Sequence, residues 1–523
     1  MFDQNLKWDV QLAHVAEKGS KWAAQIKRAT RPSWGITPKY ARRLYISTAL
    51  PKVLYAIDVW CTPIHNTGGP KVRGSMAVAK QLTTVQRAGT IAITGALRTS
   101  PTDMLDACAN TIPATLLIEK WCYRAVVRYA TLSSEHPLYK LVKASANGKV
   151  KCHRAPLHNL MQTFKLAPNS ISKIATAVRN PLDASKVPLR TSIADNKDLS
   201  NIETINALEA VKVYSDGSEI NGGVGAAAVL LRTGQAPCVL HYHLGNDAEH
   251  TVQEVELVGQ LLGIHLVKTE KAGKTSFALG TDNQAAIKTL KTDLTQLGQK
   301  IIIDFLKTAT SIQKRRGKVK YLLTLRWIAG HSGIAGNEWA DKEAKAVAGG
   351  KTSDNNLLPP LLRRNLTINP AALLHQHNKM IKEKWKANWR NSPRGVKMAE
   401  LDDTTPSNNF LNSISYSKLT RKAASTLTQI CIGHIPLNGY LHKIGRVDSP
   451  RCPACGAAVE TIQHFLFTCR SYAYMRWPLV QKCKGTLSLK KILSDTKLTE
   501  CLLQYIEETE RFSYKDEYPT FCQ

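Results

Sequence analysis

The stretch VKVYSDGSEINGGVGAAAVLL, residues 211–231, decides the fold of the most informative part of this chain. A β-branched run at 211–215 leads into Asp216, and a glycine-led apolar run occupies 222–231. Short apolar runs of this kind, bounded by glycine and polar residues, predict two strands. We expect Asp216 to end the first of them.

The sequence after residue 231 alternates between strand and helix patterns. Further strands are predicted at 237–244, 276–281 and 320–328, and helices at 252–269, 283–290, 294–314 and 336–348. Three strands followed by alternating helices and strands indicate an α/β domain at 211–349. We expect a mixed five-stranded sheet flanked by helices.

The rest of the chain divides into helical regions and polar linkers. Apolar residues at helical spacing predict a mostly helical N-terminal region at 1–180. A polar linker is expected at 181–210, and a linker with one helical segment at 350–410. The remaining residues, 411–523, are expected to form a small helical region that contains a Cys/His cluster.

Four carboxylates and one histidine of the α/β segment are candidate site residues. Asp216 and Asp282 follow predicted strands, Glu256 and Asp341 lie in predicted helices, and His331 lies in the loop before the last helix. Open α/β sheets place their sites at the carboxyl ends of strands. Hydrolysis of a phosphodiester by two divalent ions requires several converging carboxylates, and these oxygen ligands suit Mg²⁺ or Mn²⁺.

Each of these residues also has a plain structural interpretation. An Asp after a strand is often a turn former, and Asp282 could cap the following helix. Glu254 competes with Glu256, while Asp341 alone could be a solvated helix charge and His331 an ordinary loop residue. Their joint occurrence in this order favours a metal site.

A second cluster has the spacing of metal ligands. Cys452, Cys455, His464 and Cys469 form the pattern C-x2-C-x8-H-x4-C. Three thiolates and one imidazole suit tetrahedral Zn²⁺ in a structural site, and Gly456 allows the tight turn after the first pair. The alternatives are a redox-active CxxC or a helix hairpin with unrelated thiols.

The charge of the chain indicates a polyanionic partner. The 523 residues carry a net charge of +31, with a pI of about 9.7. Residues 211–349 hold 17 Lys and Arg against 13 Asp and Glu, so +27 of the net charge lies outside them. Basic segments that flank a nearly neutral core favour nucleic acid as the partner, the alternative being a merely soluble basic protein.

A basic run precedes the fifth predicted strand. It could hold a phosphate backbone, or it could be a solvated helix end that the helix dipole favours. The run consists of Lys314, Arg315, Arg316, Lys318 and Lys320.

Cysteine usage and hydropathy indicate the compartment. The first residues lack the charged start and apolar core of a secretory signal, and no apolar run reaches the roughly 18 residues of a membrane span. We therefore expect an intracellular protein, nuclear or cytoplasmic and not secreted, that has no membrane partner. Most of its 12 cysteines are expected to be buried free thiols.

In order, spacing and surrounds, the blocks around the four carboxylates and His331 resemble the type 1 ribonuclease H domain over residues 211–349. The family pattern resembles Thr-Val-Phe-Glu-Ala-Glu, which selects Glu256 over Glu254. Gln253 replaces the usual aromatic residue here, which is a departure in packing rather than in chemistry.

This resemblance implies a role for each residue. Asp216 would bridge two Mg²⁺ ions, Asp341 would serve the ion that activates water, and Glu256 and Asp282 would serve the other. His331 would assist proton transfer or product release. The residues expected to contact the substrate are Gly217, Ser218, Asn283 and Gln284.

The flanking regions resemble parts of non-LTR retrotransposon polyproteins. Gly433-His434-Ile435-Pro436 and the Cys/His cluster are similar to the zinc-binding tail of these proteins, although Cys431-Ile432 replaces a frequent Arg-Thr. Residues 6–8, 42–60 and 93–101 look like the segment after the reverse transcriptase palm, which corresponds to thumb and connection. No polymerase signature is present, so we expect no RNA copying.

The sequence therefore predicts Mg²⁺-dependent cleavage of the RNA strand of RNA/DNA hybrids. One alternative is a folded but inactive nucleic-acid-binding remnant of a retroelement. Another is a zinc-dependent interaction or scaffold protein. RNA/DNA hybrid and other nucleic acid are the expected partners.

Overall fold

A computed structural model describes most of the chain. The described residues are 8–31, 34–66, 71–148, 155–173, 187, 189–232, 234–271, 276–290, 298–316, 323–407, 419–484 and 486–512. They form two compact units, one from Met1–Cys122 with Met380–Gln523 and the other from Tyr123–Lys379. Because the chain leaves the first unit and later returns to it, these units cut across the five segments expected from sequence.

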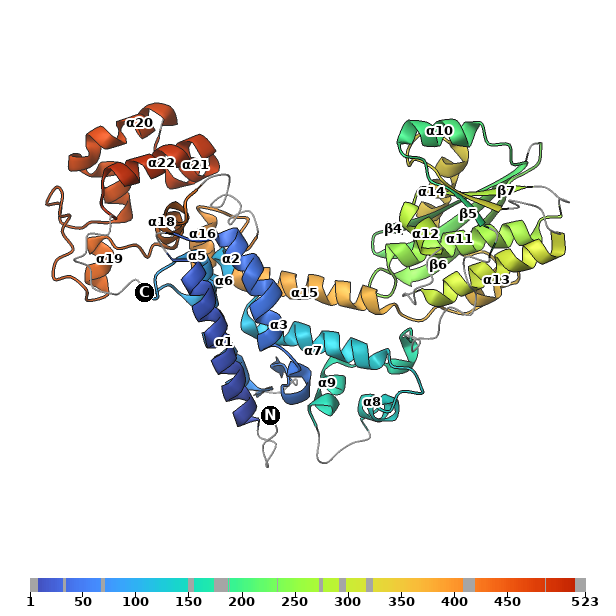
Figure 1. The fold of residues 1–523 in the computed structure, drawn as a ribbon, viewed down its shortest axis with the longest axis horizontal. Coiled ribbons are helices and arrows are strands. Elements are labelled where there is room, and N and C mark those ends of the chain that lie inside the picture. The colour runs from blue at the N-terminus through green and yellow to red at the C-terminus, as the bar shows by residue number, and fades with distance from the viewer. Residues whose placement is uncertain are drawn as a thin grey trace. The chain divides into compact units, whose positions relative to one another are not determined.

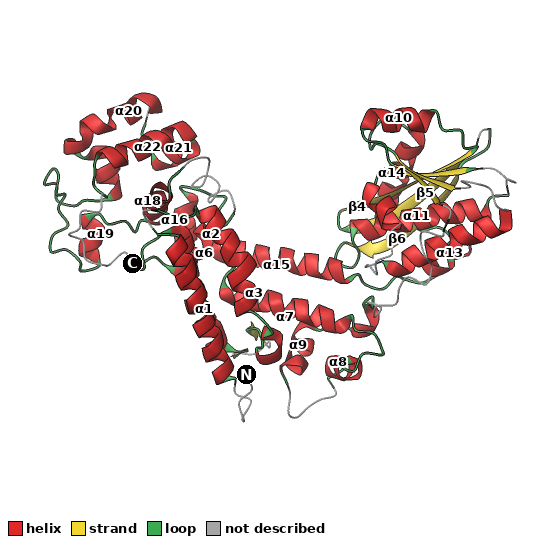
Figure 2. Ribbon diagram, in the orientation of Figure 1, coloured by secondary structure: helices red, strands yellow, loops and turns green. Residues whose placement is uncertain are grey.

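The second unit is built on one six-stranded sheet (Figures 1 and 2). The strand order is β3-β8-β7-β4-β5-β6. β4 pairs antiparallel with β5 and parallel with β7, so the sheet is mixed, as predicted. The strands are β3 (Leu189–Ser192), β4 (Val211–Ile220), β5 (Gly223–Leu231), β6 (Cys238–Asn246), β7 (Phe277–Thr281) and β8 (Leu323–Trp327).

All five strands predicted within 211–349 are present, and a sixth strand from outside that segment extends the sheet. The additional strand, β3, comes from the segment expected to be a linker and pairs parallel with β8 at the edge of the sheet. It is only four residues long, with the sequence LRTS, so it carries no apolar pattern from which a strand could be predicted. α10 (Lys197–Ile205) follows, and its Ser200 hydroxyl donates to Trp327 O at 3.0 Å.

Helices pack on both faces of this sheet. Ala226, Ala228 and Leu230 of β5 join the core under α11 (Val252–Thr269), whereas Ala227 packs with residues of α14 (Ala335–Ala348). Alternate residues of a strand point to opposite faces, so these two helices cover opposite faces. The other helices of this unit are α8 (Tyr139–Ala146), α9 (Pro156–Phe164), α12 (Gln284–Leu290) and α13 (Gln299–Arg316).

The first unit is mainly helical in its described residues, in agreement with the predicted helical N-terminal and C-terminal regions. Two helices, α7 (Ala114–Ala130) and α15 (Pro370–Arg390), have residues in both units. The other helices of the first unit are α1 (Asp9–Ala29), α2 (Pro38–Leu44), α3 (Leu50–Val53), α4 (Ile57–Trp60), α5 (Met76–Thr94), α6 (Thr102–Cys108), α16 (Pro393–Ala399), α18 (Arg421–Ile432), α19 (Asn438–Lys443), α20 (Ala473–Cys483), α21 (Leu489–Ser494) and α22 (Thr496–Glu508). β1 (His65–Asn66) pairs antiparallel with β2 (Val72–Arg73).

A buried arginine connects the two chain segments that form the first unit. Arg421, at the start of α18, donates to Ile93 O at 2.7 Å and to Ala92 O at 2.6 Å, and both acceptors lie at the end of α5. Gln429 donates to Gly95 O at 2.8 Å from the same helix. A guanidinium beside the free carbonyls of a helix end satisfies groups that would otherwise be unpaired. α18 therefore caps α5.

Of the helices in the described ranges, none combines the length and the apolar character needed to cross a bilayer.

Candidate active site

Asp216 lies on β4, just past the point where β4 stops pairing with β7. β4 pairs with β7 only as far as Tyr214, but its pairing with β5 continues from Lys212 to Ile220. Asp216 therefore does not end its strand, as expected, but lies opposite Ala227 just beyond the end of the parallel pairing. Asp282 directly follows β7, so both carboxylates lie at the edge where the neighbouring parallel strands end.

Three carboxylates meet at this edge. Ligand oxygens of Asp216, Glu256 and Asp282 all lie within 4.8 Å of one another. Asp216 is 7 % exposed and Glu256 6 %, and Asp282 is partly buried. Buried like charges at this separation are unfavourable unless protons or cations neutralise them.

The pKa values of the carboxyl groups in the cluster reflect this burial and repulsion. Burial, followed by the charges of Asp282 and Asp341, raises the pKa of Asp216 to about 7. Burial and the charges of Asp216 and Asp282 raise the pKa of Glu256 to about 9. Glu256 Oε2 is buried and has no hydrogen-bond partner among the described residues. Such an unpartnered carboxylate oxygen in a cluster of acids fits a ligand of a divalent cation.

The two glutamates of α11 have different surroundings. Glu254 Oε2 interacts with His250 Nδ1 and accepts from Asn369 Nδ2, both at 3.0 Å. Glu254 therefore ties the segment before α15 to α11. Positions two apart on a helix point in different directions, and Glu256 is the glutamate that joins Asp216 and Asp282.

Two glycines allow α11 to approach β4 so closely. A Cβ atom at Gly217 would lie 2.8 Å from Val255 Cγ1, and one at Gly259 would lie 3.1 Å from Asp216 O. We expected Gly217 to admit a sugar-phosphate backbone, but the close neighbour of its Cα is the helix that carries Glu256. Gly217 thus has a packing role, since it allows the helix that carries Glu256 to lie against β4. Its contact with substrate stays a prediction.

Asp341 lies at the border of the cluster and is paired with a cation. Its Oδ2 accepts from Lys345 Nζ at 2.7 Å, one turn further along α14. The charge of Asp341 contributes to raising the pKa of Asp216 and of Asp282, so it faces the same site. Lys345 was not predicted, although its i,i+4 spacing from Asp341 is typical of a helical ion pair.

The loop before α14 passes beside Asp282. A Cβ atom at Gly330 would lie 3.0 Å from Asp282 Oδ2. His331 is exposed, with a φ of 52°, and its charge lowers the pKa of Asp282 against the larger effect of burial. The structure thus places His331 near the cluster, where it is accessible to solvent.

Of the residues predicted to contact substrate, Asn283 forms hydrogen bonds within the protein. Asn283 Oδ1 accepts from Ala286 N at 3.0 Å, so Asn283 caps α12 and leaves the Asp282 carboxylate to the cluster. The Asn283 side chain also bonds to Glu256 and lowers its pKa, though less than burial and the neighbouring acids raise it. Ser218 and Gln284 are partly buried, and each lies two residues after a carboxylate of the cluster, Asp216 or Asp282.

Two arginines of the predicted basic run have structural roles. Arg315 donates to Lys268 O and Arg316 to Glu270 O, both at 2.6 Å, at the end of α11. The Arg316 guanidinium also lies 4.5 Å from the centre of the Phe277 ring. Of the other members of the run, Lys314 is exposed, and Lys318 and Lys320 lie outside the described residues.

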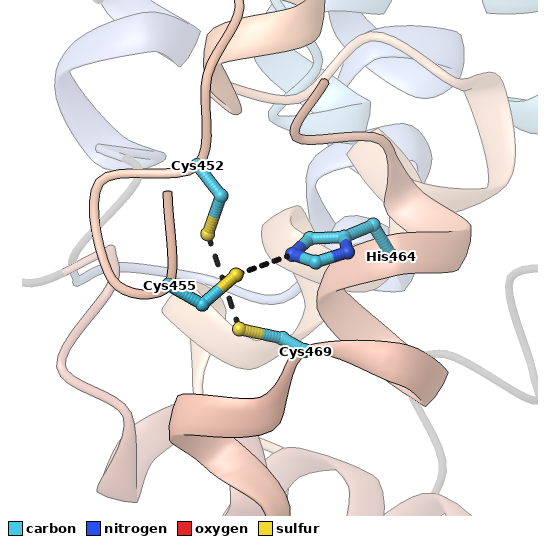
Figure 3. Close-up of side chains that lie close together, drawn as sticks. All are labelled: Cys452, Cys455, His464 and Cys469. Carbon is cyan, nitrogen blue, oxygen red and sulfur yellow. Dashed lines mark hydrogen bonds between the residues drawn. The ribbon is translucent and has the colours of Figure 1, made fainter. Parts of the chain in front are cut away.

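The Cys/His cluster is assembled in the first unit (Figure 3). Cys452 Sγ and Cys469 Sγ are 3.9 Å apart, and Cys455 Sγ and His464 Nε2 are 3.3 Å apart. Tetrahedral zinc with bonds of about 2.3 Å to sulfur and about 2.0 Å to nitrogen requires edges of about 3.8 and about 3.5 Å. The four side chains therefore have a geometry compatible with zinc.

Local bonds hold these four ligands. Gly456 N donates to Cys452 O at 2.9 Å, and Gly456 has a φ of 71°, which gives the tight turn expected between the first two thiols. Thr468 Oγ1 lies 3.4 Å from His464 Nδ1, on the side of the ring opposite the nitrogen that faces Cys455. A partner for the second ring nitrogen is typical of histidine that binds a metal.

The raised carboxylate pKa values predict how the stability of the metal-free protein depends on pH. The unfolded chain loses its Glu256 proton near pH 4, but the folded protein retains it to about pH 9, so stability falls as the pH rises through this window. Glu256→Gln should therefore stabilise the metal-free protein at pH 8, by on the order of 2 kcal/mol, and have little effect at pH 4. Thermal unfolding in chelator checks this, with the exposed Glu338→Gln as control. An equal gain at both pH values would contradict it.

The pair formed by Asp341 and Lys345 predicts competition with divalent metal. A cation that binds Asp341 must displace the Lys345 ammonium, so Lys345→Met should tighten Mn²⁺ binding by roughly 2- to 5-fold, the range of a partly exposed ion pair. Calorimetric titration of Mn²⁺ measures this directly. Lys342→Met removes an exposed lysine from the same helix and should leave the affinity unchanged. Weaker binding by the Lys345 variant would exclude competition.

Comparisons with known proteins identify the second unit's sheet domain. Residues 208–349 match the family model described as RNase H. One similar solved structure is the N-terminal RNase H domain of Rv2228c from Mycobacterium tuberculosis, a fusion with maltose binding protein, at 15% identity over 27% of this chain and 94% of that one, with a TM-score of 0.21. Another is RNase H1 from the archaeon Halobacterium salinarum, at 14% identity over 27% and 98%, with a TM-score of 0.21.

No curated protein matches this chain. The family match agrees with the domain predicted at 211–349, and the sheet order and the flanking helices are those of an RNase H fold. Residues 208–349 of this chain are an RNase H domain.

Proposed function

We propose that this protein hydrolyses the RNA strand of RNA/DNA hybrids with two Mg²⁺ ions, for which Mn²⁺ can substitute. The observation that carries the proposal is the convergence of Asp216, Glu256 and Asp282 within 4.8 Å inside an RNase H domain. An inactive remnant is not favoured, because the catalytic acids of the family pattern and His331 are all present.

The proposed chemistry assigns each residue a task. Divalent ions at the cluster supply the activation of water and the stabilisation of the leaving 3′ oxygen. Asp216 lies within 4.8 Å of Glu256 and Asp282 and is also affected by the charge of Asp341, so it would be shared by both ions. Glu256 and Asp282 would hold one ion, and Asp341 would hold the other in place of Lys345. His331, exposed at the rim, can accept or donate a proton as product leaves.

Asp216→Asn is expected to abolish hydrolysis and to preserve hybrid binding. It removes one shared negative charge without changing the shape of the site, so the rate should fall by at least about 100-fold, since even outer-shell partners of metal ligands typically account for 10- to 100-fold. The measurement is cleavage of a labelled RNA/DNA hybrid with Mg²⁺, beside a binding titration. Glu219→Gln, an exposed acid on the same strand, is the control. Wild-type protein that binds the hybrid without cutting it would support the inactive remnant.

We also propose that Cys452, Cys455, His464 and Cys469 bind a structural Zn²⁺ ion. Four protein ligands leave no open position on tetrahedral zinc, so the ion would hold the fold and not take part in hydrolysis. The cluster's observed edge lengths and the turn at Gly456 support this proposal.

Cys455→Ser is expected to remove zinc from the protein. Elemental analysis should show about one zinc per wild-type chain and almost none in the variant, because three remaining ligands bind zinc weakly. The thermal transition of the first unit should fall, whereas hybrid cleavage by the second unit should persist. Cys238→Ser, at an exposed cysteine of β6, should change neither property. Zinc retained by the Cys455 variant would contradict this assignment.

We infer that the flanking regions derive from the C-terminal part of a non-LTR retrotransposon polyprotein. Contacts between the two resembling regions support this inference. Tyr440 packs on His434 with ring centroids 4.6 Å apart, and its hydroxyl donates to Thr99 Oγ1 at 2.6 Å. Cys431, in place of the family's frequent arginine, is buried in one apolar cluster with Cys108. The motif around His434 thus joins the C-terminal region to residues 93–101.

A further inference from the structure

The outward face of α20 carries two large aromatic side chains. Tyr474 is 92 % exposed and Trp477 is 59 % exposed. They are three residues apart on the helix, so they share one face. Large aromatic residues on the solvent face of a helix are informative, because the fold does not require them there.

The opposite face of α20 accounts for the stability of the helix. Leu479 and Cys483 are buried in the apolar core that α20 shares with α22. Arg476 is buried and donates to Cys469 O at 2.8 Å. α20 lies beside α22 in the C-terminal part of the first unit (Figure 1). Tyr474 and Trp477 take no part in this packing.

The two aromatic residues belong to a longer line of side chains. Arg470, Tyr474, Trp477, Gln481 and Lys484 follow one another at spacings of four, three, four and three residues, and all five are exposed. Tyr474, Trp477 and Gln481 lie within α20, where this spacing keeps them on one face. Arg470 lies in the 3-10 turn that precedes α20, and Lys484 is the residue that ends it. We call these five residues the α20 stripe. It has a cation at each end and the aromatic pair between them.

The charge around the α20 stripe is positive. Residues 470–497 contain seven Lys and Arg against one acid, Asp495. Several of these cations have partners: Lys482 Nζ lies 3.2 Å from Cys501 Sγ, and Lys491 donates to Cys483 O at 2.7 Å. No ion pair joins Arg470 or Lys484 to an acid of the described residues. The two end cations can therefore contact phosphate.

We propose that the α20 stripe binds single-stranded nucleic acid, with bases stacked on Tyr474 and Trp477 and phosphates on Arg470 and Lys484. Aromatic faces bind bases of any sequence, and cations along the same line follow the backbone. Base stacking and phosphate contacts do not depend on the sugar, so RNA and DNA strands are expected to bind alike. A base-paired duplex does not fit, because its bases already stack on one another.

This binding site lies in the first unit and is independent of the proposed hydrolysis in the second. It can therefore be tested in the Asp216→Asn background, where strand cleavage cannot affect the result. Both aromatic side chains are exposed, so their removal should not unfold the protein. Trp34, 59 % exposed, and Tyr55, 75 % exposed, provide a matched control pair in the N-terminal half of the chain.

The experiment compares Tyr474→Ala/Trp477→Ala with Trp34→Ala/Tyr55→Ala in the full chain. Fluorescence anisotropy with labelled oligouridylate and oligodeoxythymidylate should show a loss of affinity of about 10-fold or more for the first pair, from the loss of two stacking contacts. The control pair should stay within about 2-fold, as should binding of a blunt DNA duplex by either pair.

The end cations are tested through the dependence of binding on salt. Arg470→Gln/Lys484→Gln should lower the slope of log affinity against log salt by about 1.4, because each phosphate contact on a single strand contributes about 0.7. Unchanged single-strand affinity in the aromatic variant would overturn the proposal. So would an equal loss for duplex, which indicates a general polyanion surface, or a change in self-association alone, which indicates an interface between copies of this chain.

Discussion

The close approach of α11 to β4 is the constraint on which the carboxylate cluster depends. Gly217 and Gly259 leave no room for a side chain between the strand and the helix. Glu256 and Asp216 come from elements that are 40 residues apart in sequence, and only this contact brings their carboxylates together. The packing defect that a methyl group at either glycine would create is therefore also a defect of the site.

The same packing makes it unfavourable for all the carboxylates of the cluster to be ionised at once. Burial removes water from Asp216 and Glu256, and each acid raises the pKa of the others. Within the described ranges, the ion pair between Lys345 and Asp341 places one ammonium group beside the cluster. The carboxylates thus gather in a domain of net charge +4, in a chain of net charge +31. Cations are attracted to the cluster, while the basic remainder of the chain attracts a polyanion.

The parts of the candidate site that depend on local sequence patterns could be predicted from the sequence. Asp282 follows an apolar strand whose end is readable, and the Cys/His spacing is local to one stretch. The preference for Glu256 over Glu254 required a family pattern, because both lie on one helix and the partners that engage Glu254, His250 and the distant Asn369, are known only from the structure. The packing role of Gly217 could not be predicted, because its neighbour Val255 is remote in sequence.

Other features could not be predicted because partners determine them. β3 has four residues without an apolar pattern and is a strand only because β8 pairs with it. Arg315 and Arg316 look like a phosphate-binding run, but the carbonyls at the end of α11 accept their hydrogen bonds. The pairing of Lys345 with Asp341 is the exception, since its spacing on one helix was visible in the sequence.

In the first unit, the Cys/His cluster and the α20 stripe are structurally continuous. Cys469, a buried member of the cluster, directly precedes Arg470, the first residue of the stripe. Arg476, on the inner face of α20, donates to the carbonyl of Cys469. The hydrogen bond from Arg476 thus connects the inner face of α20 to the Cys/His cluster. A zinc ion bound here, as proposed, would stabilise the segment from which the stripe begins, although its four ligands would leave no position for chemistry.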